Sequence, residues 1–209
     1  SFMQNVQLID HPLVKHSLTI LRDKNTDTET FRRHTAIVSQ IIIMEASKGI
    51  KLTKKHIETP LTSMQGYEIS RSMVFVPVLR AGISMLVPAR DFLPWTPVGF
   101  IGLERDEETA VAREYYQKFP NDIENKLVLI LDPMLASGGS VVDTITRLKE
   151  NGAKRIAIAC IVSAPEGIKR INKEHPDVYI FTSAIDDHLN EKKYIVPGLG
   201  DFGDRYFGT

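Results

Sequence analysis

Residues 127–140 read LVLILDPMLASGGS and carry more information about the fold than any other stretch. The apolar run from Leu127 to Leu131 predicts a short strand buried on both faces. Asp132 follows at once, and a few positions later a Ser-Gly-Gly-Ser sequence opens a segment with helical periodicity, residues 140–151. The stretch therefore predicts a buried strand that ends at a site, with a glycine-rich turn leading into a helix.

Similar apolar runs recur along the chain. They are MVFVPVL (73–79), PVGFIGL (97–103), RIAIACIV (155–162) and VYIFTSAI (178–185). Each is short, rich in β-branched residues and apolar throughout, which is typical of strands buried on both faces.

Helical candidates lie between these strands, at residues 83–92, 140–151 and 164–175. A longer amphipathic helix is expected at residues 29–48, with Thr28 or Thr30 as its N-cap and Gly49 at its end. Strands that alternate with helices predict an α/β fold with a central parallel sheet flanked by helices. Ligands of such sheets bind beyond the carboxyl ends of the strands, so the loops after residues 79, 103, 131 and 185 are where chemistry is expected.

Length and composition are those of one globular domain, residues 1–209. Lys plus Arg and Asp plus Glu both total 26, so no overall field draws the protein to nucleic acid or to a membrane surface. The longest apolar runs are interrupted by Arg80, Arg90 and Asp91 and are shorter than the ~20 residues of a membrane span. We expect a cytoplasmic protein that binds neither nucleic acid nor membranes.

No metal-ligand cluster or catalytic triad is evident among the six histidines. Cys160, the only cysteine, lies in the apolar run IAIACIV, which favours a buried structural thiol over a catalytic one. The candidate site therefore rests on the loop at 132–140 rather than on a nucleophile.

The glycine-rich turn after Asp132 has the makings of a phosphate site. Successive glycines let backbone N–H groups converge on an anion, and the start of the following helix adds positive potential. Ser137 and Ser140 supply hydroxyl donors. No lysine follows the glycines, so the turn is not the loop of an ATPase or GTPase. A plain glycine-rich connection between strand and helix remains the alternative on the loop alone.

This combination of strand, acid and Ser-Gly-Gly-Ser resembles the phosphoribosyl-diphosphate motif of the type I phosphoribosyltransferases. Most members of that family carry two adjacent acids, whereas the Asp-Pro-Met-Leu-Ala form here is similar to the uracil phosphoribosyltransferase branch. The likeness extends in order along essentially the whole chain, through HPLVKH (11–16), VPVLRAGISM (76–85), GLERDEET (102–109), SAPEGI (163–168), HPDV (175–178) and YIVPGLGDFGDRYFGT (194–209).

The resemblance implies a type I phosphoribosyltransferase fold with two additions to the central sheet. One is a C-terminal hood over the base, at about 186–209, and the other is a mobile flap at about 104–120. Glu104 departs from the pattern of the bacterial relatives, as does the segment that follows it.

The resemblance also implies a set of site residues. Arg80, Arg105, Asp132 and Asp201 are expected to be catalytic, and the same four residues are expected to bind 5-phosphoribosyl 1-diphosphate (PRPP). The rest of the PRPP site would be Pro133, Met134, Leu135, Ala136, Ser137, Gly138, Gly139 and Ser140. Uracil is expected at Ile195, Gly200, Asp201 and Phe202, mainly through main-chain groups. The sequence leaves open whether the Phe202 ring packs in the hood or stacks on the base.

The implied activity is that of a pentosyltransferase of pyrimidine salvage, which converts uracil and PRPP to UMP and diphosphate. Mg²⁺ is the implied cofactor, held mainly through the diphosphate, with Asp201 contacting it through water. A homodimer or larger homo-oligomer is expected, with GTP as an allosteric activator. Two alternatives stay open: a regulator of nucleotide genes that senses PRPP, and a phosphoribosyltransferase for another base.

Overall fold

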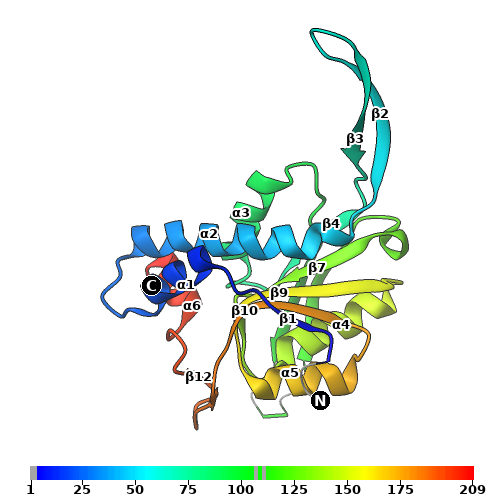
Figure 1. Ribbon diagram of the computed structural model, residues 1–209. Coiled ribbons are helices and arrows are strands. Elements are labelled where there is room, and N and C mark those ends of the chain that lie inside the picture. Colours follow the sequence, from blue (N-terminus) through cyan, green and yellow to red (C-terminus); the bar gives the residue numbers. More distant parts are fainter. Residues whose placement is uncertain (1–3, 106–107, 110–111) are drawn as a thin grey trace.

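The computed structural model describes residues 4–105, 108–109 and 112–209, with only the backbone given for Arg105 and Ala112. Its central sheet consists of β1 (Val6–Leu8), β4 (Met73–Pro77), β7 (Leu127–Leu131), β8 (Met134–Leu135), β9 (Arg155–Ser163) and β10 (Tyr179–Ile185). The strands run in the order β1-β10-β9-β7-β4, with β8 beside β9, and every pairing is parallel (Figure 1). The predicted parallel α/β sheet is confirmed.

Helices cover both faces of this sheet (Figure 1). They are α1 (Pro12–Arg22), α2 (Thr28–Ala46), α3 (Ile83–Phe92), α4 (Gly139–Glu150) and α5 (Pro165–Glu174). Because alternate residues of a strand point to opposite faces, β7 feeds two cores. Leu129 and Leu131 pack toward α1, α2 and α3, whereas Val128 and Ile130 pack toward α4 and α5.

The expected helix at 29–48 forms as α2, but its cap differs from the prediction. Asp27 is the N-cap, and its carboxylate accepts a hydrogen bond of 2.7 Å from the Thr30 N–H. Asp is among the strongest N-cap residues and outcompetes threonine there. After Ala46 the chain continues as the 3₁₀ turn η1 (Ser47–Gly49). No helix in the described ranges is long and apolar enough to cross a membrane.

The prediction that residues 97–103 form a strand of the parallel sheet holds only for the start of this run. Val98 forms a parallel bridge to Phe75 of β4. The Phe75 N–H donates to the Pro97 carbonyl oxygen, and the Phe75 carbonyl oxygen accepts from the Gly99 N–H. The chain then forms β5 (Phe100–Arg105), which pairs antiparallel with β6 (Ala112–Lys118), and the 3₁₀ turn η2 (Ile123–Asn125) leads into β7. An apolar run indicates burial but not the partner strand. The expected flap at 104–120 includes the end of β5 and all of β6. Residues 106–107 and 110–111 of this flap lie outside the described part.

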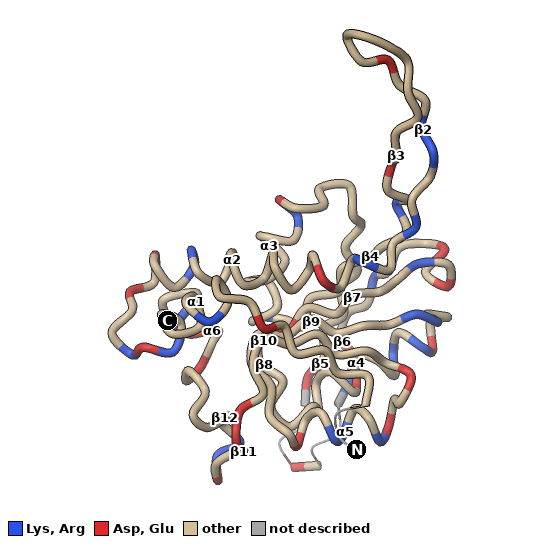
Figure 2. The backbone as a smooth tube through the Cα atoms, viewed as in Figure 1, with Lys and Arg blue, Asp and Glu red and all other residues tan. Residues whose placement is uncertain are grey.

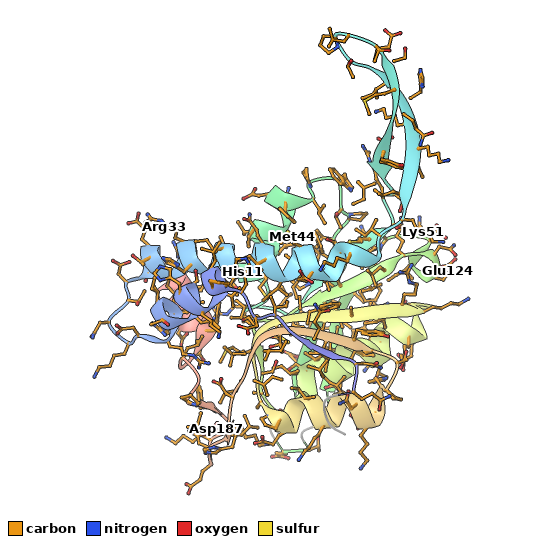
Figure 3. The ribbon with its side chains drawn as sticks, viewed as in Figure 1. His11, Arg33, Met44, Lys51, Glu124 and Asp187 are labelled. Atoms are coloured by element: carbon orange, nitrogen blue, oxygen red, sulfur yellow. The ribbon has the colours of Figure 1, made fainter. Side chains whose placement is uncertain are left out.

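A second hairpin, formed by β2 (Leu52–Glu58) and β3 (Ser63–Ile69), projects from the body (Figure 1). Its side chains extend into open space, with Lys51 at its base (Figure 3). Thr59 closes the turn, accepting at Oγ1 from the N–H groups of Leu61 and Thr62. The sequence predicts no element in this region, because neither face of the hairpin is buried and no buried pattern marks it.

The C-terminal part forms a small subdomain beside the sheet, with β11 (His188–Leu189), β12 (Ile195–Val196) and α6 (Phe202–Phe207). β11 and β12 pair antiparallel, and α6 packs against α2. The Val196–Pro197 peptide bond is cis. This is the segment for which the sequence predicts a hood.

Cys160 is fully buried in β9 and carries a free thiol. Burial raises the pKa of that thiol to about 12. The expectation that this thiol is buried is confirmed.

Candidate active site

A cavity of about 430 Å³ lies between the carboxyl ends of the central strands and the hood. Three separate parts of the chain line it: the loop after β4, the segment from the loop after β7 into α4, and the segment from the turn before β12 into α6. The cavity brings together nine of the residues expected from the sequence, namely Arg80, Asp132, Met134, Ala136, Ser140, Ile195, Gly200, Asp201 and Phe202. Their convergence follows from the parallel sheet, whose strands all end at one edge.

A smaller hollow of about 90 Å³ adjoins it at the start of α4. It is lined by Asp132, Met134, Leu135, Ala136, Ser137, Gly138, Gly139, Ser140 and Val141. The first N–H groups of a helix have no partner inside the helix, so those of α4 are available to an anion. We call this hollow the phosphate cradle.

Gly138 shapes the phosphate cradle, and its position has no room for a side chain. Its φ is +86°, and a Cβ there would lie 3.2 Å from the Gly167 carbonyl oxygen. The left-handed conformation is costly for other L-residues. Gly167, on α5, in turn approaches the Ala136 carbonyl oxygen so closely that a Cβ would lie 2.5 Å from it. The turn is therefore fixed by its packing on α5.

Asp132 ends β7 and is buried, with 9% of its surface exposed. Its Oδ1 accepts a hydrogen bond of 3.3 Å from the Met134 N–H. Burial in this poorly solvated position raises the pKa of the carboxyl to about 7, against which the single backbone hydrogen bond acts weakly. A carboxyl with such a pKa is typical of a functional site, because structural acids are usually exposed or paired.

Arg80 reaches the cavity from the loop after β4. Its guanidinium lies 5.4 Å from the centroid of the Phe207 ring, which connects this loop to the end of α6. The Leu79–Arg80 peptide bond is cis. Gly82 follows, and a Cβ there would lie 2.3 Å from the Leu131 carbonyl oxygen, so only glycine lets this loop pack on the end of β7.

The hood lines the cavity with residues 192–195 and 200–203. Gly200 has φ +84° and no bulky neighbour, which leaves its peptide groups open to the cavity. The Asp201 side chain caps α6 by accepting from the Asp204 N–H at 2.9 Å. Phe202 is 2% exposed, and its ring meets that of Phe31 edge to face at 4.9 Å between centroids. The side chain of Phe202 therefore belongs to the core that anchors the hood, which favours packing over stacking on a base.

Two of the expected residues are not placed at these cavities. Pro133 lines neither, because its carbonyl oxygen turns toward β9 and accepts from the Ile161 and Val162 N–H groups. Arg105 ends β5, and its side chain lies outside the described part of the structure.

Lys192, Lys193 and Tyr194 are among the residues of the cavity wall that sequence reasoning missed. They lie in the turn between β11 and β12, and Lys193 has φ +63°. The run of charges EKK reads as an ordinary solvated turn, and only its position beside the glycine-rich tail could have indicated the cavity. Figure 2 shows Lys and Arg interspersed with Asp and Glu elsewhere on the molecule. The positive charge at the cavity therefore comes from its own residues, Arg80, Lys192 and Lys193.

The acids of the cavity suit a cation that is held mainly by a ligand. In the described ranges no group of three or more His, Cys, Asp or Glu side chains could hold a metal by itself. Asp132 and Asp201 both line the cavity. Mg²⁺ usually keeps several waters and binds through one or two carboxylates and substrate phosphates. These residues fit Mg²⁺ that arrives with a diphosphate.

Comparisons with known proteins agree with this geometry. Residues 8–209 match the family model described as uracil phosphoribosyltransferase. A uracil phosphoribosyltransferase of Levilactobacillus brevis is 47% identical over 208 residues, which are 99% of this chain and all of that protein.

Solved structures show the same fold. The AQ2163 protein from Aquifex aeolicus superposes with a TM-score of 0.89 at 36% identity, over 98% of both chains. An adenine phosphoribosyltransferase from Trypanosoma brucei, 12% identical, superposes with a TM-score of 0.60 over 95% of this chain and 88% of that one, which shows the fold alone. The predicted type I phosphoribosyltransferase fold is thus confirmed, and the chain belongs to the uracil phosphoribosyltransferase family.

Proposed function

We propose that this protein converts uracil and PRPP to UMP and diphosphate, as a pentosyltransferase of pyrimidine salvage. The observation that carries the proposal is the cavity in which a buried acid, an arginine and the hood meet, beside the adjoining phosphate cradle. The family description and the name of the L. brevis relative support uracil as the base.

Each part of the cavity has a role in this reaction. The phosphate cradle would hold the 5′-phosphate through the N–H groups at the start of α4. Asp132 would accept hydrogen bonds from the ribose hydroxyls. Arg80, with Arg105 from β5, would bind the diphosphate, and Lys192 and Lys193 would add positive potential at the rim.

The chemistry is a substitution at C1′ of the ribose. The bond from N1 of uracil to C1′ forms while the bond from C1′ to the diphosphate oxygen breaks, and the N1 proton leaves to solvent. The ribose gains positive charge during the exchange, which the carboxylate of Asp132 would stabilise, whereas Arg80 would stabilise the departing diphosphate. Mg²⁺ bound to the diphosphate would supply further charge to the leaving group, with Asp201 contacting it through water.

Uracil recognition would rely on the main chain of Ile195, Gly200 and Phe202. Cytosine presents a donor where uracil presents its O4 acceptor, and an acceptor where uracil presents its N3–H. Two buried groups would then go unpaired at about 1–3 kcal/mol each. We expect a preference for uracil of about 10²–10⁴ in kcat/KM.

The test is an assay of radiolabelled uracil with PRPP and Mg²⁺, scored for UMP, with cytosine and purine bases as competitors. Formation of UMP alone is the expected result. Turnover of another base at a comparable rate would assign the protein to that base. PRPP binding without turnover of any base would favour the regulator that the sequence left as an alternative.

Three further expectations stay predictions. They are a cytoplasmic location, activation by GTP and assembly into a homodimer or larger homo-oligomer. The β2–β3 hairpin supports the last of these, because it exposes Leu52, Leu61 and Tyr67, with 63%, 95% and 66% of their surfaces accessible. Sedimentation of the intact chain and of a variant with charged residues at these positions would test it.

A further inference from the structure

The hood loop is held by an ion pair that the sequence analysis did not single out. Arg22, the last residue of α1, donates to both carboxylate oxygens of Asp186, at 2.8 and 2.7 Å. Asp186 follows β10 and its side chain is only 4% exposed. The pair lies next to residues 198–200, of which Gly200 lines the cavity.

Both partners also bind the main chain of Gly198. The Arg22 guanidinium donates to the Gly198 carbonyl oxygen at 2.8 Å, and the Gly198 N–H donates to the Asp186 carboxylate at 2.8 Å. The backbone N–H and carbonyl oxygen of Gly198 are thus both hydrogen-bonded to the same ion pair. Gly198 has φ +58°, and a Cβ there would lie 2.1 Å from the Ile195 carbonyl oxygen, so the position accepts only glycine.

A second arginine holds the next residue. Arg205, on α6, donates to the Leu199 carbonyl oxygen at 2.9 Å and also to the carbonyl oxygens of Leu21 and Asp23 at the end of α1. Residues 198 and 199 are therefore held from both sides, by Arg22 of α1 and by Arg205 of α6.

Gly200 differs from both of these residues. Within the described part of the chain, no protein group forms a hydrogen bond with its N–H or its carbonyl oxygen. It lines the cavity with φ +84°. When a ligand in the cavity excludes water from Gly200, the unpaired peptide groups need a new hydrogen-bond partner. The ligand itself can provide that partner.

We infer that Arg22 and Asp186 form a positioning pair for base recognition: by occupying the polar groups of Gly198, they set which backbone groups of the hood remain for the base. This inference rests on the proposed function and adds two residues to it. Neither residue lines the cavity, so both act through the loop. Arg22 and Asp186 lie far from the phosphate cradle in the chain and do not line it.

The inference is tested with Arg22→Met, Asp186→Asn and the milder Arg22→Lys. Loss of charge-assisted hydrogen bonds to the loop should raise the KM for uracil about tenfold or more in the first two variants, with a smaller rise in Arg22→Lys. The Kd of PRPP, measured by calorimetry, should change less than about twofold, since the cradle is untouched. The double variant Arg22→Met/Asp186→Asn should be less impaired than the product of the single effects, because both changes remove the same pair.

Asp177→Asn is the matched control. It removes an ion pair of similar length, to Lys149 at 2.8 Å, on another part of the molecule, and should leave the KM for uracil unchanged.

If the wild type makes no UMP, the proposed function fails. If the wild type is active and the folded variants keep its uracil KM, the positioning pair is refuted while the function stands. A parallel rise in uracil KM and PRPP Kd would show a structural role and also refute it. Should Arg22→Met fail to fold, Arg22→Lys and Asp186→Asn decide the question.

Discussion

The two halves of the cavity are built in different ways. The phosphate cradle is lined by one continuous segment, residues 132–141, in which a strand, a turn and a helix follow one another and pack on α5. The hood loop takes its shape from residues far away in the chain: Arg22 is 176 positions from Gly198, and Arg205 is 184 positions from Leu21. All lining residues of the first half thus come from one segment, whereas the second half depends on pairing between segments far apart in the chain.

This difference teaches where substitutions should act. A change in the phosphate cradle should weaken every ligand that carries a 5′-phosphate, whatever its base. A change in the supports of the hood should weaken the base alone, even when the altered residue never touches it. The two classes can be separated by measuring PRPP, UMP and uracil side by side.

The largest effect is expected for Gly138→Val, which alters the phosphate cradle. The side chain forces a left-handed backbone position out of shape and removes charge-assisted hydrogen bonds to the phosphate, each worth about 1.5–3 kcal/mol. The Kd values of PRPP and UMP should both rise about a thousandfold by calorimetry. Gly152→Val is the control, because Gly152 has φ +96° but no neighbour within 4 Å. It should cost similar stability and leave binding intact, whereas equal binding losses in both variants would mean that strain alone explains the effect.

A smaller effect is expected for Asp132→Asn, and it should depend on pH. The carboxyl of the unliganded protein has a pKa of about 7, whereas that of an unfolded chain is near 4. Between these values the folded state binds more protons, so this group makes the free energy of unfolding fall as the pH rises. The amide removes that dependence and should stabilise the protein by about 2–4 kcal/mol at pH 8, with no gain below pH 4.

Denaturant unfolding at several pH values measures this difference. Asp177→Asn provides a control of opposite sign, because the hydrogen bond from Lys149 lowers the pKa of Asp177. Its removal should cost stability at neutral pH, and the cost should disappear in acid. Superimposable pH profiles of the wild type and Asp132→Asn would contradict a carboxyl held in a poorly solvated site.

The smallest effect is expected for Phe202→Leu in the hood. The Phe202 ring packs on Phe31 and is 2% exposed, so the change should cost about 1 kcal/mol of stability through the lost aromatic contact. The KM for uracil should stay within about threefold of the wild type, and the preference over cytosine should persist. Steady-state kinetics with both bases checks this, and a large loss of uracil affinity would show that the ring stacks on the base after all.

The same contrast explains how far the sequence could predict the molecule. The strand at Leu127–Leu131 and the helix at Ile83–Phe92 match their predicted bounds, because short buried strands and amphipathic helices carry local patterns. Only the start of the run at 97–103 lies along the parallel sheet, and the rest pairs with β6, since apolarity does not identify the partner strand. The resemblance supplied the expected residues of the hood, but not Arg22 and Asp186, whose roles arise only when α1 and the end of β10 meet.

The pairing of Arg205 with the end of α1 has a consequence for synthesis. A ribosome that has added Leu21 must add 184 more residues before Arg205 exists. At about 5–20 residues per second this takes roughly 10–40 s. The strand, turn and helix of the cradle, and the α5 helix on which they pack, are all synthesised by residue 174, so the nascent chain contains every segment of its phosphate site before it contains Arg205.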